Sequence, residues 1–287
     1  MSKSRLKLFL ETVVLAVICL LPLHGAEKSL RVVSLSPSLT ELICVLGAEE
    51  VLAGRSSACD YPESVQKVPI AGDFAIPNME LLVALQPDIV IADTLVDPEV
   101  AKTIRTLGIR FELLPLKELA DYPAAARKLG KLLNRVDKGE AEAAAFEVAV
   151  NALKQNLTQQ PIKVLILFCI DPPITCGKNS FLTEYIRLAG GESITGDIDK
   201  SYFAVSPEYL FLHEPEVVVI PAAPGEDSKS PPAFPEALQQ LKAIRENRVW
   251  HEVDSFGLSR LGPRWKQAIQ TLKKVFAETR SHSAVQE

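Results

Sequence analysis

Residues 78–91 read NMELLVALQPDIVI, and residues 206–219 read SPEYLFLHEPEVVV. Aligned without gaps, each stretch gives a helix-capping residue, a glutamate two positions later, an apolar helix, a proline, an acid and a β-branched strand. A second pair of segments precedes them in the same order. Residues 40–49 and 183–192 each run from Thr-Glu through an apolar helix to a glycine, which is typical of a helix end. These two matches predict that one α/β unit occurs twice in the chain.

The two copies differ in length. Thr40 and Thr183 are 143 positions apart, whereas Glu80 and Glu208 are 128 positions apart. The first copy therefore carries about 15 additional residues, around RSSACDYPESVQKVP at 55–69. Because the matches keep their order on both sides of this stretch, we interpret it as a longer connection within a duplicated unit.

Short β-branched runs alternate with helices in both halves, which predicts mostly parallel sheets covered on both faces. Between the halves, residues 121–157 are rich in Ala, Leu, Lys and Glu. We expect helices there at about 122–134 and 137–157, with Asp137 as N-cap of the second. At 1.5 Å per residue the second helix spans roughly 30 Å, enough to join two lobes, although an ordinary surface helix is the alternative. The predicted fold class is α/β, with two Rossmann-like lobes whose mostly parallel sheets are joined by a single long backbone helix.

The first 26 residues have the pattern of an export signal, with a basic start, an apolar stretch over residues 12–23 and small residues at Gly25 and Ala26. This stretch is short for a transmembrane helix, which needs roughly 20 residues. His24 makes the cleavage site imperfect, so an uncleaved N-terminal membrane anchor stays open. We expect a periplasmic or otherwise exported protein and divide the chain into a signal peptide (1–26), an N-terminal lobe (27–136), a connecting helix (137–158) and a C-terminal lobe (159–287).

Composition argues against several classes of function. The net charge is −5, and no run of basic residues follows the extreme N-terminus, so a nucleic-acid-binding face is not expected. The chain has no G-x-G-x-x-G, no phosphate-binding G-x-x-x-x-G-K-[ST] and no G-x-S-x-G nucleophile turn. Its four histidines are scattered. We therefore predict a monomeric protein that is not an enzyme and carries no cofactor or resident metal.

Four cysteines lie beyond residue 26: Cys44, Cys59, Cys169 and Cys176. An exported compartment permits disulfides, and we consider pairing Cys44 with Cys59 and Cys169 with Cys176. Buried free thiols, which behave as small apolar residues, are an equally open alternative. Because no C-x-x-C pair occurs, neither a zinc site nor thioredoxin-like redox chemistry is expected.

In an open parallel sheet, ligands bind at the loops that follow the carboxyl ends of the strands. Two such lobes facing each other would form a cleft lined by two sets of loops. The aromatic and charged residues of these loops suit a large, flat, partly charged ligand. The candidate ligand-binding residues in the loops are Ser36, Arg55, Ala58, Tyr61, Phe74, Asp93, Tyr202, Phe203, Asp254, Phe256 and Arg260.

Glu80 and Glu208 occupy equivalent positions in the first turns of their helices. A negative charge there complements the helix dipole by roughly 0.3–1 kcal/mol, and this role alone would explain either residue. The alternative is functional, since duplication places one acid on the outer rim of each lobe. Such a pair could dock on two arginine patches of a dimeric membrane partner.

The sequence resembles the periplasmic binding proteins for iron complexes and vitamin B12, and is most similar to those of cobalamin ABC importers. The residues that carry the resemblance are RVVSLSPSLTELICVLG (31–47), SSACDYP (56–62), NMELLVALQPDIVIA (78–92), DPPITCGKNS (171–180), LAGGESI (188–194) and VSPEYLFLHEPEVVVI (205–220). These segments span nearly the whole chain after residue 26, in the family's order.

The resemblance implies the class III periplasmic binding protein fold and a ligand held between the lobes, which is delivered to a dimeric membrane permease of an ABC importer. It also implies that Glu80 and Glu208 contact permease arginines. Ala58 stands where B12-binding members have an aromatic residue, and Asp254 and Arg260 match a polar pair of the family. The resemblance therefore points to cobalamin or a related corrinoid as the ligand, with heme or a ferric siderophore as the alternative.

Overall fold

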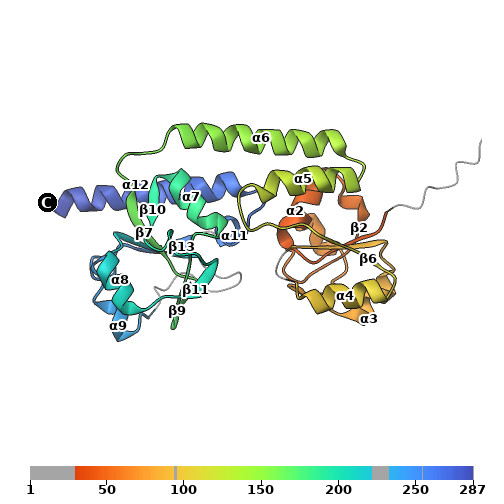
Figure 1. The fold of residues 1–287 in the computed structure, drawn as a ribbon, viewed down its shortest axis with the longest axis horizontal. Helices are drawn as coiled ribbons and strands as arrows, with labels where there is room; N and C mark the ends of the chain where they lie inside the picture. Colours follow the sequence, from red (N-terminus) through yellow and green to blue (C-terminus); the bar gives the residue numbers. More distant parts are fainter. Residues whose placement is uncertain (1–29, 94–95, 222–232, 254, 287) are drawn as a thin grey trace, which may run out of the picture. The chain divides into compact units, whose positions relative to one another are not determined.

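The computed structural model describes residues 30–93, 96–221, 233–253 and 255–286, and gives only the backbone for 252, 253, 255, 256 and 282–286. From Arg31 onward the described residues form one compact unit, which contains two separate parallel sheets (Figure 1). None of the helices in the described part of the chain combines the length and the apolar character needed to cross a membrane.

The N-terminal lobe is built on a four-stranded sheet with the order β2-β1-β5-β6, and all neighbouring strands are parallel. Its strands are β1 (Val32–Ser34), β2 (Leu52–Arg55), β5 (Ile89–Ala92) and β6 (Arg110–Leu113). Every residue of β1 and β5 is buried, as expected for central strands covered on both faces. The connecting elements are α2 (Pro37–Val45), the short 3-10 helices η1 (Glu49–Val51) and η2 (Glu63–Lys67), the hairpin β3 (Gly72–Asp73) and β4 (Ile76–Pro77), α3 (Met79–Leu85) and α4 (Pro98–Thr106).

The C-terminal lobe repeats this plan with a parallel sheet of order β10-β7-β12-β13. Its strands are β7 (Ile162–Ile166), β10 (Gly191–Ser193), β12 (Val217–Pro221) and β13 (Val249–Val253). Its helices are α7 (Phe181–Ala189), α8 (Pro207–His213), α9 (Glu236–Gln239), α10 (Lys242–Arg245), α11 (Ser255–Leu258) and α12 (Trp265–Gln286). The two sheets have the same strand order, which confirms the predicted duplication of an α/β unit.

One feature of the C-terminal lobe was not predicted. A three-stranded antiparallel sheet of order β11-β9-β8 extends from the parallel sheet, and consists of β8 (Cys169–Ile170), β9 (Pro173–Cys176) and β11 (Tyr202–Ala204). These strands are two to four residues long, too short for an alternating pattern to stand out in the sequence.

The repeated segments form the same contacts in both lobes. The Asn78 side chain accepts the amide N–H of Leu81 at the start of α3, and Ser206 accepts that of Tyr209 at the start of α8. Both helices have seven residues and end at a residue in the left-handed conformation. The two caps explain why asparagine and serine occupy equivalent positions, since both side chains satisfy an unpaired N–H of the first turn.

The acid that follows each proline joins the helix to the sheet. Asp88 accepts the backbone N–H of Arg31 at 2.9 Å, and Glu216 accepts that of Lys163 at 2.7 Å. Each of these acids also donates its own backbone N–H to the carbonyl of the same partner. These hydrogen bonds, which are the same in both lobes, fix where β5 starts relative to β1 and where β12 starts relative to β7.

The additional residues of the first copy cover one edge of its sheet. The backbone N–H of Arg55, in β2, donates to Pro69 O at 2.9 Å, and Ala71 N–H donates to Arg55 O at 2.7 Å. The segment around residues 69–71 thus lies alongside β2 as an added parallel partner. The equivalent edge strand of the other sheet, β10, has no such neighbour among the described residues.

Two helices connect the lobes, α5 (Asp121–Leu132) and α6 (Val136–Gln155). The 20-residue α6 follows the prediction closely, but Arg135 is its N-cap, and Asp137 lies in the first turn instead of capping it. Figure 1 shows α5 and α6 running side by side. Aromatic rings from three elements meet here. The ring centre of Phe146, in α6, lies 4.8 Å from that of Tyr122 in α5 and 4.8 Å from that of Trp265 in α12.

Candidate functional site

A cavity of about 290 Å³ lies between loops of the two lobes. The N-terminal lobe contributes residues that follow the carboxyl ends of β1, β5 and β6, together with the β3–β4 hairpin. The C-terminal lobe contributes residues that surround β9, α7, β11 and the segment between α11 and α12. The lining residues are Pro37, Ser38, Phe74, Asp93, Leu116, Lys117, Asn179, Ser180, Phe181, Ser201, Tyr202, Ser259, Arg260 and Leu261.

Four of the residues predicted from the sequence line this cavity together: Phe74, Asp93, Tyr202 and Arg260. Ser36 does not line it, but its hydroxyl donates to Asp93 Oδ2 at 2.6 Å from a fully buried position. The hydroxyl oxygen of Ser36 also caps α2. The structure therefore gives Ser36 a role in holding Asp93.

The cavity has an exposed aromatic ring on each lobe. Phe74 is 39% exposed and Tyr202 is 48% exposed. The Tyr202 ring packs edge-on against Phe168, with ring centres 5.3 Å apart, and its hydroxyl lies 3.4 Å from the Ser180 hydroxyl. Burial of the hydroxyl end raises the pKa of Tyr202, a shift that the hydrogen bond from Ser180 partly offsets. At neutral pH the phenol is therefore protonated and can donate a hydrogen bond to a ligand.

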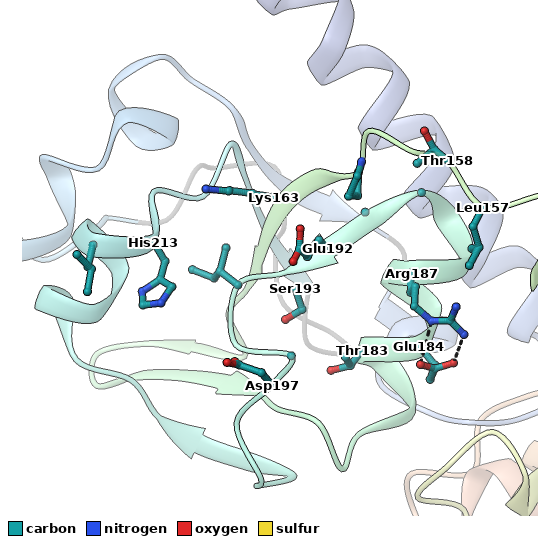
Figure 2. A pocket seen from close by; sticks show the side chains of 16 residues that line it. Leu157, Thr158, Lys163, Thr183, Glu184, Arg187, Glu192, Ser193, Asp197 and His213 are labelled. Atoms are coloured by element: carbon teal, nitrogen blue, oxygen red, sulfur yellow. Dashed lines mark hydrogen bonds and ion pairs between the residues drawn. The ribbon is translucent and has the colours of Figure 1, made fainter.

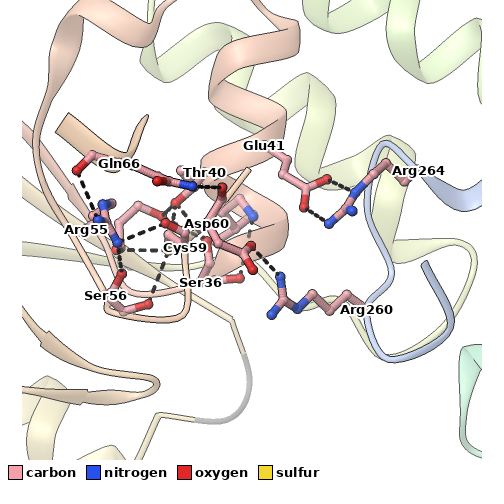
Figure 3. A network of polar contacts seen from close by, with 12 residues as sticks. Ser36, Thr40, Glu41, Arg55, Ser56, Cys59, Asp60, Gln66, Arg260 and Arg264 are labelled. Atoms are coloured by element: carbon pink, nitrogen blue, oxygen red, sulfur yellow. Dashed lines mark hydrogen bonds and ion pairs between the residues drawn. The ribbon is translucent and has the colours of Figure 1, made fainter. Parts of the chain in front are cut away.

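Two arginines of the C-terminal lobe reach the N-terminal lobe beside the cavity (Figure 3). Arg260 pairs with Asp60 at 3.3 Å. Arg264 forms a two-pronged pair with Glu41 of α2, at 3.0 and 2.5 Å, and its guanidinium lies 4.6 Å from the centre of the Tyr61 ring. Neither Glu41 nor Arg264 was predicted as part of the site.

Arg55 was predicted to contact the ligand, but the structure gives it another task. Its side chain is 7% exposed, and the guanidinium donates to the carbonyl oxygens of Ser56, Cys59, Val65 and Gln66 (Figure 3). Arg55 thereby organises the additional residues of the first copy and does not line the cavity. A long charged side chain in a loop cannot be assigned to a ligand or to backbone carbonyls from sequence alone.

The remaining predicted residues lie elsewhere or outside the described part. Ala58 is half-buried, and Tyr61 is 50% exposed beneath Arg264, so neither lines the cavity. Phe203 packs on the core of the C-terminal lobe, with Lys200 Nζ 5.4 Å from its ring centre. Asp254 and the side chain of Phe256 lie outside the described residues.

The four cysteines within the described residues are free thiols, so the pairings considered from the sequence are absent from this structure. The Cys59 sulfur instead accepts the Thr40 hydroxyl at 3.1 Å and lies 3.2 Å from the Ser56 hydroxyl. Cys169 faces Ile174 across the β8–β9 ladder, two residues short of Cys176. That offset is unfavourable for a disulfide, whose Cα atoms are usually about 4.4–6.8 Å apart.

Glu80 and Glu208 are both exposed at the starts of α3 and α8, as the repeat implies. The pKa of Glu208 is lowered by its own backbone N–H and by the Ser206 hydroxyl, so its carboxylate is charged at neutral pH. No ion pair within the described residues involves either acid.

A larger hollow of about 800 Å³ lies along the edge strand β10 of the C-terminal lobe (Figure 2). None of the predicted ligand-binding residues that the structure describes lines it. Its walls come from the C-terminal lobe and the end of the connection into it, including Lys163, Arg187, Glu192 and His213. The smaller cavity is the better candidate, because loops of both lobes line it and those of the N-terminal lobe follow the carboxyl ends of parallel strands.

Among the lining residues that were missed, Lys117 could have been found by the strand-end rule, but Asn179 and Ser180 could not. Lys117 follows the predicted strand that ends near residue 114, at its carboxyl end. Asn179 and Ser180 follow β9, a strand that the sequence did not reveal. Across the described residues, no three His, Cys, Asp or Glu side chains are placed to hold a metal ion.

Comparison with known proteins agrees with this architecture. The family described as periplasmic binding protein matches residues 32–252. The vitamin B12-binding protein of Pectobacterium atrosepticum is 27% identical over 255 residues, which cover 86% of this chain and 88% of that protein.

Solved structures of periplasmic binding proteins also resemble this chain. The periplasmic heme-binding protein of Roseiflexus sp. RS-1 in its apo form is 27% identical, with a TM-score of 0.73, and covers 88% of this chain and 99% of its own. The vitamin B12-binding protein of Vibrio cholerae has the same fold, with a TM-score of 0.73, 24% identity and coverage of 87% and 97%. With its doubled parallel-sheet unit and a family match that spans both sheets, the chain belongs to the periplasmic binding protein family.

Proposed function

We propose that this protein captures cobalamin or a related corrinoid in the cavity between its lobes and delivers it to the membrane permease of an ABC importer. The observation that carries the proposal is the cavity itself. Phe74 and Tyr202 offer an aromatic face from each lobe, and Arg260 and Lys117 add cationic groups. A corrinoid is a large macrocycle with amide and phosphate groups, which suits this combination of aromatic and cationic contacts. The Pectobacterium relative supports the same ligand class.

Heme is the second candidate. Its planar ring could pack against the same aromatic side chains, and its two propionates could pair with the same cations. The similarity to the Roseiflexus heme-binding protein favours keeping this alternative. A ferric siderophore is a further candidate for the same cavity.

Titration of the purified protein with cyanocobalamin, cobinamide, heme and a ferric siderophore distinguishes these ligands. We expect a corrinoid to bind with a Kd of about 1 μM or lower in calorimetry. Tyr202→Ala and Phe74→Ala should each weaken binding at least about fivefold, because each removes an aromatic contact. Phe211→Ala, which changes an exposed ring on α8 outside the cavity, is the matched control. Binding of heme alone would transfer the proposal to heme, and no binding of any of the four would reject it.

We further propose that Glu80 and Glu208 dock on the two subunits of the permease. Their support is their equivalence, because each is a charged, exposed acid in the first turn of the same repeated helix. The variant Glu80→Ala/Glu208→Ala should lose most ligand uptake in cells while its ligand affinity stays unchanged.

A control separates docking from the helix-dipole role. Asp137 is an exposed acid in the first turn of α6, so Asp137→Ala removes a comparable dipole interaction far from α3 and α8 in the sequence. Its uptake should stay normal. Normal uptake by the Glu80/Glu208 double variant would rule out the docking role.

We infer that residues 1–26 are an export signal, that lobes 27–136 and 159–287 are joined by the 137–158 helix, and that the protein works as a periplasmic monomer without a cofactor. It should release its ligand chemically unchanged, as a binding protein does and an enzyme does not. The mass of the exported protein checks the signal, since cleavage after Ala26 removes the first 26 residues. Full-length protein in the membrane fraction would instead show an N-terminal anchor.

A further inference from the structure

The two short helices that carry the docking acids also expose apolar side chains. On α3, Val83 is 51% exposed and Ala84 is exposed beside it. At the equivalent positions of α8, Phe211 is 40% and Leu212 is 79% exposed. An isolated exposed apolar residue needs no explanation. Two adjacent exposed apolar residues, found on the equivalent helix of both lobes, do need an explanation.

These residues share a helix face with the acids. Val83 and Ala84 lie three and four residues after Glu80, a spacing that places them beside it on the helix surface. The same spacing relates Phe211 and Leu212 to Glu208. The helices cannot turn this face inward, because Leu82 of α3 and Leu210 of α8 are fully buried on the opposite side. Each lobe therefore presents one acid with two apolar neighbours.

We propose that Val83–Ala84 and Phe211–Leu212 are the apolar parts of two equivalent docking surfaces, each matching one of two identical permease subunits. This inference rests on the proposed delivery function. The negative charge of each surface requires a cation on the partner, and the adjacent apolar residues require an apolar side chain next to that cation. Because the surfaces occur twice in equivalent form, they fit a partner that also presents its surface twice.

The two surfaces differ in size. Phe and Leu remove more apolar area from water than Val and Ala, so the C-terminal surface contributes more to binding. Leu212 also lines the hollow along β10, together with its neighbour His213. A side chain of the partner that contacts Leu212 thus has a recess beside it. The equivalent edge of the N-terminal lobe, at β2, is instead covered by residues around 69–71.

The test compares Phe211→Ser/Leu212→Ser and Val83→Ser with wild type. The matched control is Val148→Ser, which changes a 70% exposed apolar residue of α6. One measurement is uptake of radiolabelled cyanocobalamin by cells that carry each variant in place of the wild-type protein. The other is binding of the purified protein to membrane vesicles from those cells at 0.1 M and 1 M NaCl. Calorimetric titration with cyanocobalamin checks that ligand affinity is intact.

We expect the Phe211/Leu212 variant to bind the vesicles at least about tenfold more weakly and Val83→Ser about threefold more weakly, with normal cyanocobalamin affinity. Wild type should keep part of its binding at 1 M NaCl, where charge pairs are screened within about 3 Å, and the Phe211/Leu212 variant should lose it. Val148→Ser should behave as wild type throughout.

The outcomes separate the two proposals. Loss of uptake with Glu80→Ala/Glu208→Ala but normal uptake and vesicle binding with the serine variants would overturn the apolar surfaces and leave acid-based docking in place. Normal uptake in both sets would overturn docking by α3 and α8 altogether. An equal loss with Val148→Ser would also overturn the inference, because the effect would then follow from exposed apolar area in general.

Discussion

Glu41 is a carboxylate with almost no access to water, since the residue is only 4% exposed. Its two oxygens bond the guanidinium of Arg264, whose side chain is 15% exposed. Taking two charges out of water costs several kcal/mol, and their attraction offsets that cost only while both partners are present. The pair joins α2 of the N-terminal lobe to the segment before α12, so it acts as a fixed contact between lobes.

Replacing one partner of this pair should therefore lower the free energy of unfolding more than replacing both partners. We expect Glu41→Leu to lower the free energy of unfolding by about 3 kcal/mol, because it removes the carboxylate that the largely buried Arg264 guanidinium bonds through two nitrogens. Glu41→Leu/Arg264→Met should cost less than the sum of its single changes, with a coupling of about 1–3 kcal/mol in a double-mutant cycle measured by urea denaturation.

The exposed pair of Glu99 and Lys102 provides the control for this cycle, since these side chains are 77% and 72% exposed. Glu99→Gln should change the stability by no more than about 0.5 kcal/mol. Strictly additive effects of the Glu41 and Arg264 changes would show that the buried contact contributes nothing specific.

The same carboxyl group predicts a dependence on pH. Burial raises the pKa of Glu41 above 4.5, and the hydrogen bond from Arg264 offsets only part of this rise. The native state thus holds the Glu41 proton more tightly than the unfolded chain does. The resulting stabilisation is complete below pH 4.5 and is lost as the pH rises through the native-state pKa. The stability advantage of wild type over Glu41→Gln should shrink over that range, and an advantage that grows with pH would contradict this assignment.

At the residue scale, hydrogen-bond partners that are close along the chain could be predicted from the sequence, and distant partners could not. The caps at Asn78 and Ser206 follow from residue type and position. Glu41 and Arg264 are separated by 223 residues, so no local pattern could pair them. Arg55 shows the complementary error, because its loop position was predictable and its backbone partners were not.

The helices α5 and α6 approach each other at two glycines. A Cβ atom added at Gly139 would lie 2.6 Å from the backbone oxygen of Ala126 and 3.0 Å from Gly130 Cα. Both glycines are buried within helices, where glycine normally weakens the structure by about 1 kcal/mol relative to alanine. Close contact between the two backbones accounts for their presence.

Gly139→Ala should therefore destabilise the protein despite the better helix propensity of alanine. We expect a loss of about 1–3 kcal/mol, as for overpacking of a filled interior, in thermal or urea unfolding. Ala141→Leu, on an exposed position of the same helix, should stay within about 0.5 kcal/mol of wild type. A gain in stability from Gly139→Ala would show that the two helices can separate without cost.

At the element scale, long elements and repeated elements were predictable, and short irregular ones were not. The span of α6 and the pairing of α3 with β5 and of α8 with β12 follow from composition and from the repeat. The antiparallel strands β8, β9 and β11 have no equivalent in the first copy and too few residues for a periodic signal.

The two lobes share several contacts besides the connecting helices. Phe181 N–H, at the start of α7, donates to the carbonyl of Lys117 in the N-terminal lobe at 2.8 Å. Trp265 is 3% exposed and packs on Phe146, which packs in turn on Tyr122. Unfolding one lobe would expose these side chains on the other.

The protein should therefore unfold in one cooperative transition. In scanning calorimetry we expect the calorimetric and van't Hoff enthalpies of wild type to agree. Trp265→Ala/Glu41→Leu, which removes an aromatic contact and an ion pair between the lobes, should lower the melting temperature and separate the transition into two. Two transitions in wild type would mean that the lobes are stable independently.

At the scale of the whole molecule, the duplicated α/β unit was predictable because two of its segments recur in the sequence in the same order. The repeat indicated two α/β lobes with mostly parallel sheets, and the strand-end rule indicated where a cavity would form. Which loop residues reach that cavity depends on the relative placement of the lobes. Contacts such as Asp60–Arg260 decide that placement, and they join residues 200 positions apart.

The edge strand β10, which has no further strand beside it in the described part of the chain, has a consequence for association between molecules. Parallel pairing directs the N–H and C=O groups of alternate residues in this strand away from β7, where a strand of another molecule could bond to them. Glu192 is exposed on this short strand opposite Lys163, and such charges discourage accidental association between sheets. Neutralising Glu192 would therefore make the β10 edge more prone to association, whereas the equivalent edge at β2 is covered by the segment around residues 69–71.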